Sequence, residues 1–193
     1  MAKVSWKGGT LLAPLPAVMV TCGDMENSNI ITIGWTGIVN THPPMTYISV
    51  RPTRHSYNII KEKGEFAINL VPAELVKKAD YCGIYTGKKV DKFAKCGLGK
   101  QEAKEVGCPI IVESPMALEC KVKEIIPLGT HDMFLAEIVA TDVDEAIIDK
   151  NGKLCLDRVK LTSYAHGEYF ELGKKIGKFG FSTAKGNSKK KKK

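Results

Sequence analysis

"ITIGWTGIVNTHPPMTYISVRPTRHSYNII", residues 31–60, contains both kinds of regular structure that this chain uses. Two runs rich in Ile, Val, Thr and aromatic residues, 31–40 and 45–51, lie on either side of the turn "THPP", which predicts two β-strands. "HSYNIIKEKG" follows with helical spacing, and we expect Ser56 to be its N-cap and Gly64 its stop. The chain therefore passes from strand to helix through "RPTRHS", a segment dense in hydrogen-bond donors.

From the residues alone, this junction is most simply a surface turn with a capping serine and two solvated arginines. The alternative is a phosphate site, since a phosphate dianion is best bound by guanidinium forks, hydroxyls and the free backbone N–H groups at a helix start. Arg51, Arg54 and Ser56 supply that set. The family resemblance given below is what favours the phosphate site.

Further strand signals lie on both sides of this stretch. Runs rich in Val, Ile and aromatic residues, bounded by turn formers, predict strands at 15–22, 65–71, 116–128 and 131–148. A second helix is expected within "PAELVKKADYCG", 72–83. Residues 83–109 are polar and punctuated by glycine, and long unpatterned loops inside compact domains are more often functional than idle.

The order of these elements predicts the fold class. About six strands follow one another mostly as meanders, with helices inserted after the third and fourth, and neither a βαβ series nor an internal repeat is visible. We therefore expect an α+β, mainly β domain built on an antiparallel barrel. At 193 residues the chain is long enough for one core, so we expect one domain, 1–184, and a disordered lysine-rich tail, 185–193.

The charge of the chain lies largely in that tail. The formal net charge is +8, and subtracting the five terminal lysines leaves +3. Such a run is ordinarily a solvated tail; attraction to RNA or another acidic surface is the alternative, without sequence readout. No aromatic-plus-basic RNA signature accompanies it, so we expect no specific nucleic-acid partner.

The six cysteines form no CxxC pair, which excludes zinc-ribbon and thioredoxin-like proteins. We expect no secretory leader and no membrane span, since the apolar stretch near residue 15 is short and carries two prolines. Free thiols in a reducing cytoplasm are the simplest account. Each cysteine is then a small core residue, unless one of them is redox-active.

Other familiar motifs are absent. "GIYTGKK" has the wrong glycine spacing for a P-loop, and "GLGKQE" lacks the third glycine of a dinucleotide-binding fingerprint. The four histidines make no short metal-binding pair, and there is no GxSxG elbow. We therefore expect neither a metal centre nor a serine hydrolase.

Five segments together resemble the flavin reductase-like family, the FMN-binding split barrels, and within it the flavoredoxin branch. The resemblance spans about residues 10–170 and rests on the order and spacing of the segments. They are "ITIGWTGIVNTHPP" before a strand ending in Arg, "SYNI", "GEFAINLV", "GKKVDKF" and "LECKVKEIIPLGTHDMFLAEIV". The resemblance implies a six-stranded antiparallel split barrel that forms a homodimer, with FMN near the subunit interface.

The family resemblance also implies a role for each site residue. The residues implied to contact FMN are Asn29, Thr32, Trp35, Thr36, Ser49, Arg51, Arg54, Ser56, Lys92 and Tyr164. Ser56 replaces a threonine and Tyr164 an aromatic that is often phenylalanine. His131, at a barrel rim, is the implied catalytic residue, contacting the flavin or receiving a nicotinamide. Trp35 is alternatively a core or interface aromatic, Lys92 a solvated loop lysine, and His131 a structural histidine.

The function expected from this resemblance is an FMN-dependent oxidoreductase that takes electrons from NADH or NADPH. The alternative is a flavoredoxin-type carrier that exchanges electrons with a redox protein partner. A third outcome is a binding module without flavin. The residues alone identify neither the donor nor the acceptor.

Overall fold

The structure, a computed structural model, describes residues 1–183. The tail expected at 185–193 lies outside the described residues. The larger elements are β2 Val18–Gly23, β3 Ser28–Ile33, β4 Thr36–Thr41, β5 Pro44–Val50, α1 His55–Lys63, β6 Glu65–Leu70, α2 Val76–Ile84, α3 Lys92–Cys96, β9 Met116–Pro127 and β10 Asp132–Val143. The shorter ones are β1 Leu15–Pro16, β7 Lys100–Gln101, β8 Ile110–Ile111, β11 Thr162–Ala165, β12 Glu168–Glu171 and the 3-10 turns Ala73–Leu75, Glu145–Ile147, Leu156–Arg158 and Phe181–Thr183.

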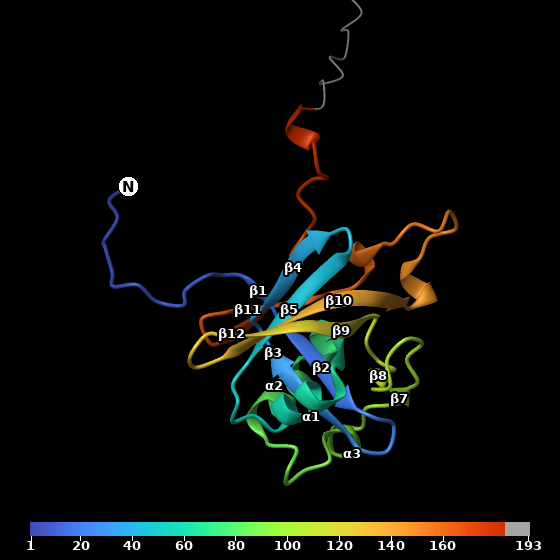
Figure 1. The fold of residues 1–193 in the computed structure, drawn as a ribbon. Coiled ribbons are helices and arrows are strands. Elements are labelled where there is room, and N and C mark those ends of the chain that lie inside the picture. The colour runs from blue at the N-terminus through green and yellow to red at the C-terminus, as the bar shows by residue number, and fades with distance from the viewer. Residues whose placement is uncertain (184–193) are drawn as a thin grey trace, which may run out of the picture.

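The main sheet has seven strands in the order β3-β2-β6-β9-β10-β5-β4, and every neighbouring pair is antiparallel. The mainly β fold class is confirmed. The two end strands, β3 and β4, do not pair, so the sheet curls without closing (Figure 1). Two register shifts between β9 and β10 bend these long strands.

The sheet has seven strands rather than six because the run 31–40 divides at Gly34 and Trp35. β3 ends at Ile33 and pairs with β2, whereas β4 begins at Thr36 and pairs with β5. The backbone N–H of Ser49 donates to the Trp35 carbonyl at 3.0 Å, which holds the break against β5. The continuous apolar run 31–40 therefore forms both end strands of the sheet, β3 and β4, and Trp35 lies at the break between them.

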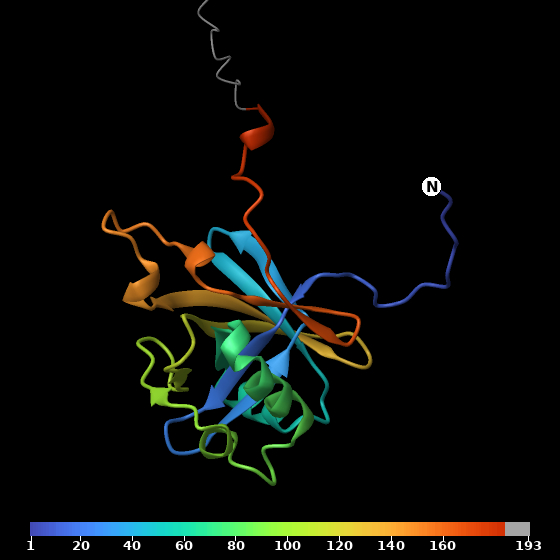
Figure 2. The same ribbon diagram turned by 180° about the vertical axis from the view of Figure 1, so that it is seen from behind.

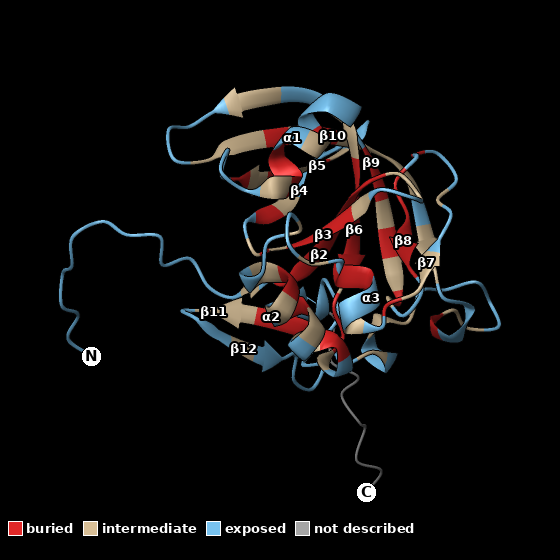
Figure 3. Ribbon diagram, turned by 90° about the horizontal axis from the view of Figure 1, so that it is seen from below, coloured by how far each residue is buried: buried red, intermediate tan, exposed pale blue. Residues whose placement is uncertain are grey.

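All six residues of β2 are buried, because this strand lies between two cores (Figure 3). Val20 faces a cluster inside the curled sheet that includes Phe66, Phe134 and Ile60 of α1. Met19, on the opposite face, packs in a second cluster with side chains of α2 and α3. Alternate side chains of a strand point to opposite faces, so β2 joins the two cores and fixes the helices on the sheet.

Helix α1 begins after Arg54, so the expectation of Ser56 as N-cap is wrong. Arg54 holds the extended cap conformation without a side-chain cap bond, and Ser56 lies inside the first turn with its hydroxyl buried. The expected stop at Gly64 is confirmed: its φ is 70°, and its N–H donates to Ile60 O at 2.9 Å. Glycine adopts this left-handed conformation without strain.

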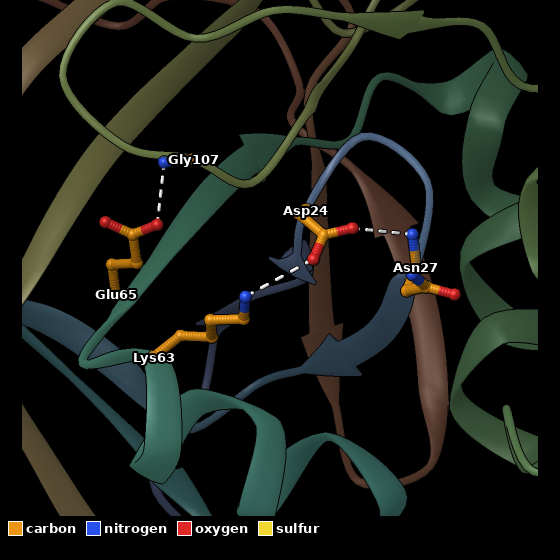
Figure 4. A network of polar contacts seen from close by, with 5 residues as sticks. All are labelled: Asp24, Asn27, Lys63, Glu65 and Gly107. Atoms are coloured by element: carbon orange, nitrogen blue, oxygen red, sulfur yellow. Dashed lines mark hydrogen bonds and ion pairs between the residues drawn. The ribbon is translucent and has the colours of Figure 1, made fainter.

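The long loop after α2 is more ordered than its sequence indicates. It contains α3 and the β7–β8 pair, and its later part is tied to the sheet where Gly107 N donates to Glu65 Oε1 at 2.6 Å (Figure 4). Beside it, Lys63 pairs with Asp24 at 3.3 Å, and Asp24 accepts from Asn27 N at 2.7 Å. These contacts fix the loop to β6 and the end of α1 to the turn between β2 and β3.

One further strand boundary differs from the sequence expectations. The run 131–148 is strand only to Val143, after which Asp144 caps the 3-10 turn Glu145–Ile147. Residues near the N-terminus, and residues 172–183 after β12, extend away from the folded body (Figures 1 and 2). The helix expected within 72–83 is confirmed as α2, preceded by one 3-10 turn.

Candidate functional site

A groove follows β3 and consists of three adjoining pockets of ≈ 170, ≈ 170 and ≈ 310 Å³. We call them the arginine pocket, the indole pocket and the tyrosine pocket. The first two share Ile31, Arg51 and Arg54, and the last two share residues 32–35. Together their volumes fall within the range of about 300–1,000 Å³ that is typical of small-molecule and cofactor sites.

The arginine pocket is built at the junction of β5 and α1. Arg51 directly follows β5, and Arg54 is the N-cap of α1, so both guanidinium groups stand at a helix start. Ser56, 1% exposed, accepts a hydrogen bond from Asn29 Nδ2 at 2.8 Å. That contact fixes the first turn of α1 to β3 and leaves the serine hydroxyl facing the pocket wall.

Lys92 adds a buried ammonium group to the same pocket. It is 4% exposed, and its Nζ donates to Ile30 O at 2.6 Å and Cys82 O at 2.7 Å. Burial lowers its pKa, and Arg54 acts in the same direction. Among the residues that the structure describes, neither Lys92 nor the two arginines has a carboxylate within 4.0 Å. The pocket therefore holds positive charge without a protein counter-ion, which suits an anion.

The indole pocket places Trp35 against His131. Their ring centroids are 4.6 Å apart with the planes tilted by 41°. Arg51 Nε donates to His131 Nε2 at 3.3 Å, and His131 Nδ1 lies 3.0 Å from the Thr130 hydroxyl. Burial, followed by the charges of Arg51 and Arg54, lowers the pKa of His131. The lowered pKa favours the neutral imidazole, and in that form the proton is on Nδ1, because Nε2 accepts from the guanidinium.

The tyrosine pocket lies between β3, α2 and the small sheet of β11 and β12. Tyr164 and Tyr169 meet edge to face at 5.3 Å, and Tyr169 OH donates to Asp80 Oδ1 at 3.2 Å. Burial, together with Asp80, raises the pKa of Tyr169 to about 12. With Trp35 on the opposite side, this part of the groove offers aromatic surfaces to a flat ligand.

The structure gathers ten of the eleven residues that the sequence singles out. Asn29, Arg51, Arg54, Ser56 and Lys92 line the arginine pocket; Ser49, His131, Trp35 and Thr32 line the indole pocket; Tyr164 lines the tyrosine pocket. Thr32 donates its hydroxyl to Ala79 O, which anchors α2. Thr36 is not among the lining residues: it is buried and donates to Tyr47 O at 2.5 Å. The cofactor role of each residue remains a prediction.

The sequence analysis missed one wall of the arginine pocket, the loop from Tyr85 to Gly87. Gly87 lies so close to β3 that a Cβ atom there would be 2.2 Å from Asn29 Oδ1 and 2.8 Å from His55 Cδ2. The "TGKK" sequence was set aside because it does not match a P-loop. The length and polarity of 83–109 were the only signals that pointed to this wall.

Two other features are absent from residues 1–183. No group of three or more His, Cys, Asp or Glu side chains there is placed to hold a metal ion. No helix there is long and apolar enough to cross a membrane.

The chain belongs to the flavin reductase-like family, whose domain model, "Flavin reductase like domain", matches residues 11–173. It is 34% identical to flavoredoxin of Desulfovibrio vulgaris (Miyazaki F), with a TM-score of 0.87 over 95% of this chain and 100% of that one. It is 28% identical to flavoredoxin from Methanosarcina acetivorans, with a TM-score of 0.83 over 94% and 100%. A sequence relative, FMN reductase (NADH) RutF of Pseudomonas syringae pv. syringae, is 27% identical over 52% of this chain and 54% of that protein. The resemblance stated from the sequence is confirmed, together with the split-barrel fold.

Proposed function

We propose that this protein is an FMN-binding oxidoreductase and that FMN occupies the groove along β3. The observation that carries the proposal is the set of three cations, Arg51, Arg54 and Lys92, none of which has a carboxylate within 4.0 Å among residues 1–183, at one end of a groove with aromatic walls. A flavin mononucleotide has a matching form, with a phosphate at one end and a flat ring system at the other. The printed names of the flavoredoxins and of the FMN reductase support this assignment.

The arginine pocket fits the phosphate. Its two guanidinium groups, the Ser56 hydroxyl and the backbone N–H groups of the α1 start are donors that favour a dianion. Burial, followed by the charges of Lys88 and Lys92, lowers the pKa of His55, which lines the same pocket. A bound phosphate would neutralise these charges.

The remainder of the groove fits the ring system. Trp35 and Tyr164 provide aromatic surface that stacks on a flat ligand and excludes water from it. Bound FMN would supply two-electron chemistry between a nicotinamide donor and an acceptor. Arg51 and Thr130 hold His131 in one orientation and one tautomer at the rim of the groove. A neutral imidazole there can accept a proton, which adds a positive charge beside the arginines that a bound phosphate would offset.

The electron donor is NADH or NADPH in our first proposal, which the name of the RutF relative supports. A second candidate is a flavoredoxin-type carrier that receives electrons from a redox protein. The extent of the likeness favours it, because the match to a flavoredoxin covers 95% of the chain and the match to RutF only 52%. Stopped-flow mixing of the FMN-loaded protein with each nucleotide separates the two. Rapid bleaching of the flavin supports the enzyme; indifference to both nucleotides, with reduction by a ferredoxin-like donor, supports the carrier.

We also propose that the protein is a homodimer of the cytoplasm. Support for a dimer comes from β4, an edge strand that exposes Ile38 and Val39 at 65% and 50% of their surfaces. Support for a reducing compartment comes from the six cysteines, all of which are free thiols.

Arg51→Ala tests the proposed function directly. The variant loses a charge-assisted contact to the phosphate, so we expect FMN affinity to fall by roughly 1.5–3 kcal/mol, one to two orders of magnitude in Kd. Riboflavin, which lacks the phosphate, should bind the variant and the wild type alike. Arg158→Ala, at a guanidinium that binds Ala146 O far from the groove, is the control and should bind FMN normally. A wild-type protein that takes up no FMN would refute the proposal.

A further inference from the structure

Two cysteines lie together beside the arginine pocket. Cys82 of α2 and Cys96, the last residue of α3, have their sulfur atoms 4.0 Å apart. Cys82 is buried and lines the pocket, whereas Cys96 is partly exposed. A disulfide bond is about 2.05 Å long, so the two sulfurs need to approach by about 2 Å, which side-chain rotation and a small shift of the five-residue α3 can supply.

We propose that Cys82 and Cys96 are a thiol–disulfide exchange site that reacts with low-molecular-weight disulfides and thereby locks one wall of the arginine pocket. Neither the family assignment nor the FMN proposal requires such a site. It is a pair on two different helices, close enough to bond and reachable from solvent through one member. The other buried thiols, Cys22, Cys108 and Cys120, are fully enclosed.

The two cysteines have different roles in the exchange. Burial raises the pKa of Cys82 to about 12, so the first attack comes from Cys96 as the thiolate. The Cys96 thiolate attacks one sulfur of the small disulfide, forms a mixed disulfide and releases one thiolate. Cys82 then loses its proton, attacks the Cys96 sulfur and displaces the second thiolate. The protein loses two hydrogens as protons and two electrons, and the small disulfide is reduced to two thiols.

The bond would enclose the loop that forms the pocket wall. Residues 83–95 lie between the two cysteines, and they include Thr86, Gly87 and Lys92 of the arginine pocket. At present α3 is held there by the Lys92 ammonium, which bonds to carbonyls of β3 and α2, and by the packing of Phe93 in the cluster with Met19. A disulfide between α2 and α3 would restrict the same loop whether the pocket is empty or occupied. We therefore expect bound FMN to leave severalfold more slowly from the oxidised protein, an expectation that rests on the proposed function.

The bond itself is tested without flavin. The full-length protein is incubated with oxidised glutathione, alkylated, digested with trypsin and analysed by mass spectrometry without reduction. Lys88, Lys89 and Lys95 separate the two cysteines, so a disulfide joins two tryptic peptides and is identified as their cross-link. We expect this cross-link in the wild type and in Cys155→Ser, its loss on addition of dithiothreitol, and its absence from Cys96→Ser. Free thiols alone, or glutathione adducts that never resolve to the cross-link, would overturn the proposal.

The coupling to the pocket is measured separately. FMN dissociation is followed by fluorescence for the oxidised and reduced protein, with Cys96→Ser treated identically as the control. The lock is supported if FMN leaves the oxidised wild type more slowly than the reduced protein while Cys96→Ser shows no such difference. Equal rates for the oxidised and reduced wild type would exclude the lock. If the protein takes up no FMN, the proposed function fails while the mass-spectrometric result still decides whether the exchange site exists.

Discussion

His131 reports the charge of the neighbouring pocket, because its ring nitrogen accepts a hydrogen bond from Arg51. Burial and the charges of Arg51 and Arg54 lower its pKa. A phosphate dianion bound to those guanidinium groups would cancel the contribution of the two arginines while leaving the burial in place. Binding of a phosphate to Arg51 and Arg54 would therefore change the pKa of His131, which can be measured.

We predict that FMN raises the pKa of His131 and that riboflavin does so much less. The imidazole proton signals, assigned with His131→Gln, give the titration by NMR in each state. The pKa rises because the phosphate cancels the contribution of the two arginines, whereas riboflavin leaves that contribution in place. An unchanged or lower pKa in the FMN complex would place the phosphate away from the two arginines.

Asp142 is a second residue whose environment has a measurable consequence. Its pKa is raised from 3.8 to about 6, first by burial and then by Glu119, a buried carboxylate. Glu119 accepts the backbone N–H groups of Lys104, Glu105 and Val106, three hydrogen bonds that favour its ionised form. One carboxyl group of the pair is therefore favoured in its protonated form.

Because the folded pKa of Asp142 lies above its unfolded value, the contribution of this residue to stability is fully present below about pH 4. It is lost as the pH rises through about 6. Asp142→Asn keeps a neutral side chain at all pH values, so we predict a higher Tm than the wild type near pH 8 and a gap that closes towards pH 4. Differential scanning fluorimetry across this range measures it, with Asp144→Asn as the control. A gap independent of pH would contradict the assignment.

At the scale of elements, residues 85–87 form the part of the site that depends most on close packing. Gly87 admits no side chain without displacing Asn29 or His55. Asn29 in turn donates to Ser56 at 2.8 Å, so a change at this loop reaches the first turn of α1. The loop, β3 and the helix start form one packed unit.

We therefore predict that Gly87→Ala lowers FMN affinity about tenfold or more, because it moves the Asn29 carboxamide from its bond with Ser56. The glycine has no positive φ, so the effect would arise from space and not from backbone strain. Gly173→Ala, at a glycine with nothing within 4 Å, is the matched control. FMN titration followed by fluorescence measures both variants, and normal affinity in Gly87→Ala would show that the wall is not part of the site.

Sequence reasoning located these elements well and their boundaries less well, for identifiable reasons. Local patterns predicted the strands, α1 and its stop at Gly64, since these depend on residue spacing and on one left-handed glycine. The break at Trp35 was not visible, because both halves of 31–40 have the same composition and only their pairing with different strands separates them. The local pattern predicts Ser56 as a cap because it does not show the bond with Asn29, which lies 27 residues away along the chain.

The candidate site likewise contains residues that the sequence predicts and residues that depend on contacts the sequence does not show. The charged residues were found because phosphate chemistry and the family pattern both mark them. The loop wall was missed because its contribution is a close approach of backbone, which no side-chain type records. Thr36 was included on the family pattern, yet its hydroxyl donates to Tyr47 O within the sheet. Such hydrogen bonds depend on strand register, which the sequence does not show directly.

At the scale of the whole molecule, the open sheet leaves β4 as an edge strand bound on one side by β5. Four of its six residues are exposed, and Ile38 and Val39 are among them. Exposed apolar edge strands invite pairing and are usually covered in natural proteins. β4 also begins next to Trp35 of the indole pocket, so whatever covers it lies near the groove.

Ile38→Asp tests the proposed homodimer as the cover of this edge. An aspartate in the middle of an apolar interface would be a buried, unpaired charge. Burying such a charge commonly costs several kcal/mol of association free energy. We therefore predict that the wild type sediments as a dimer at micromolar concentration and that Ile38→Asp sediments as a monomer with unchanged circular dichroism. Ile176→Asp, at an isoleucine that is also exposed but lies outside β4, should remain dimeric. If the variant stays dimeric, or if the wild type is a monomer, β4 is not the dimer interface and another partner must cover the edge beside the groove.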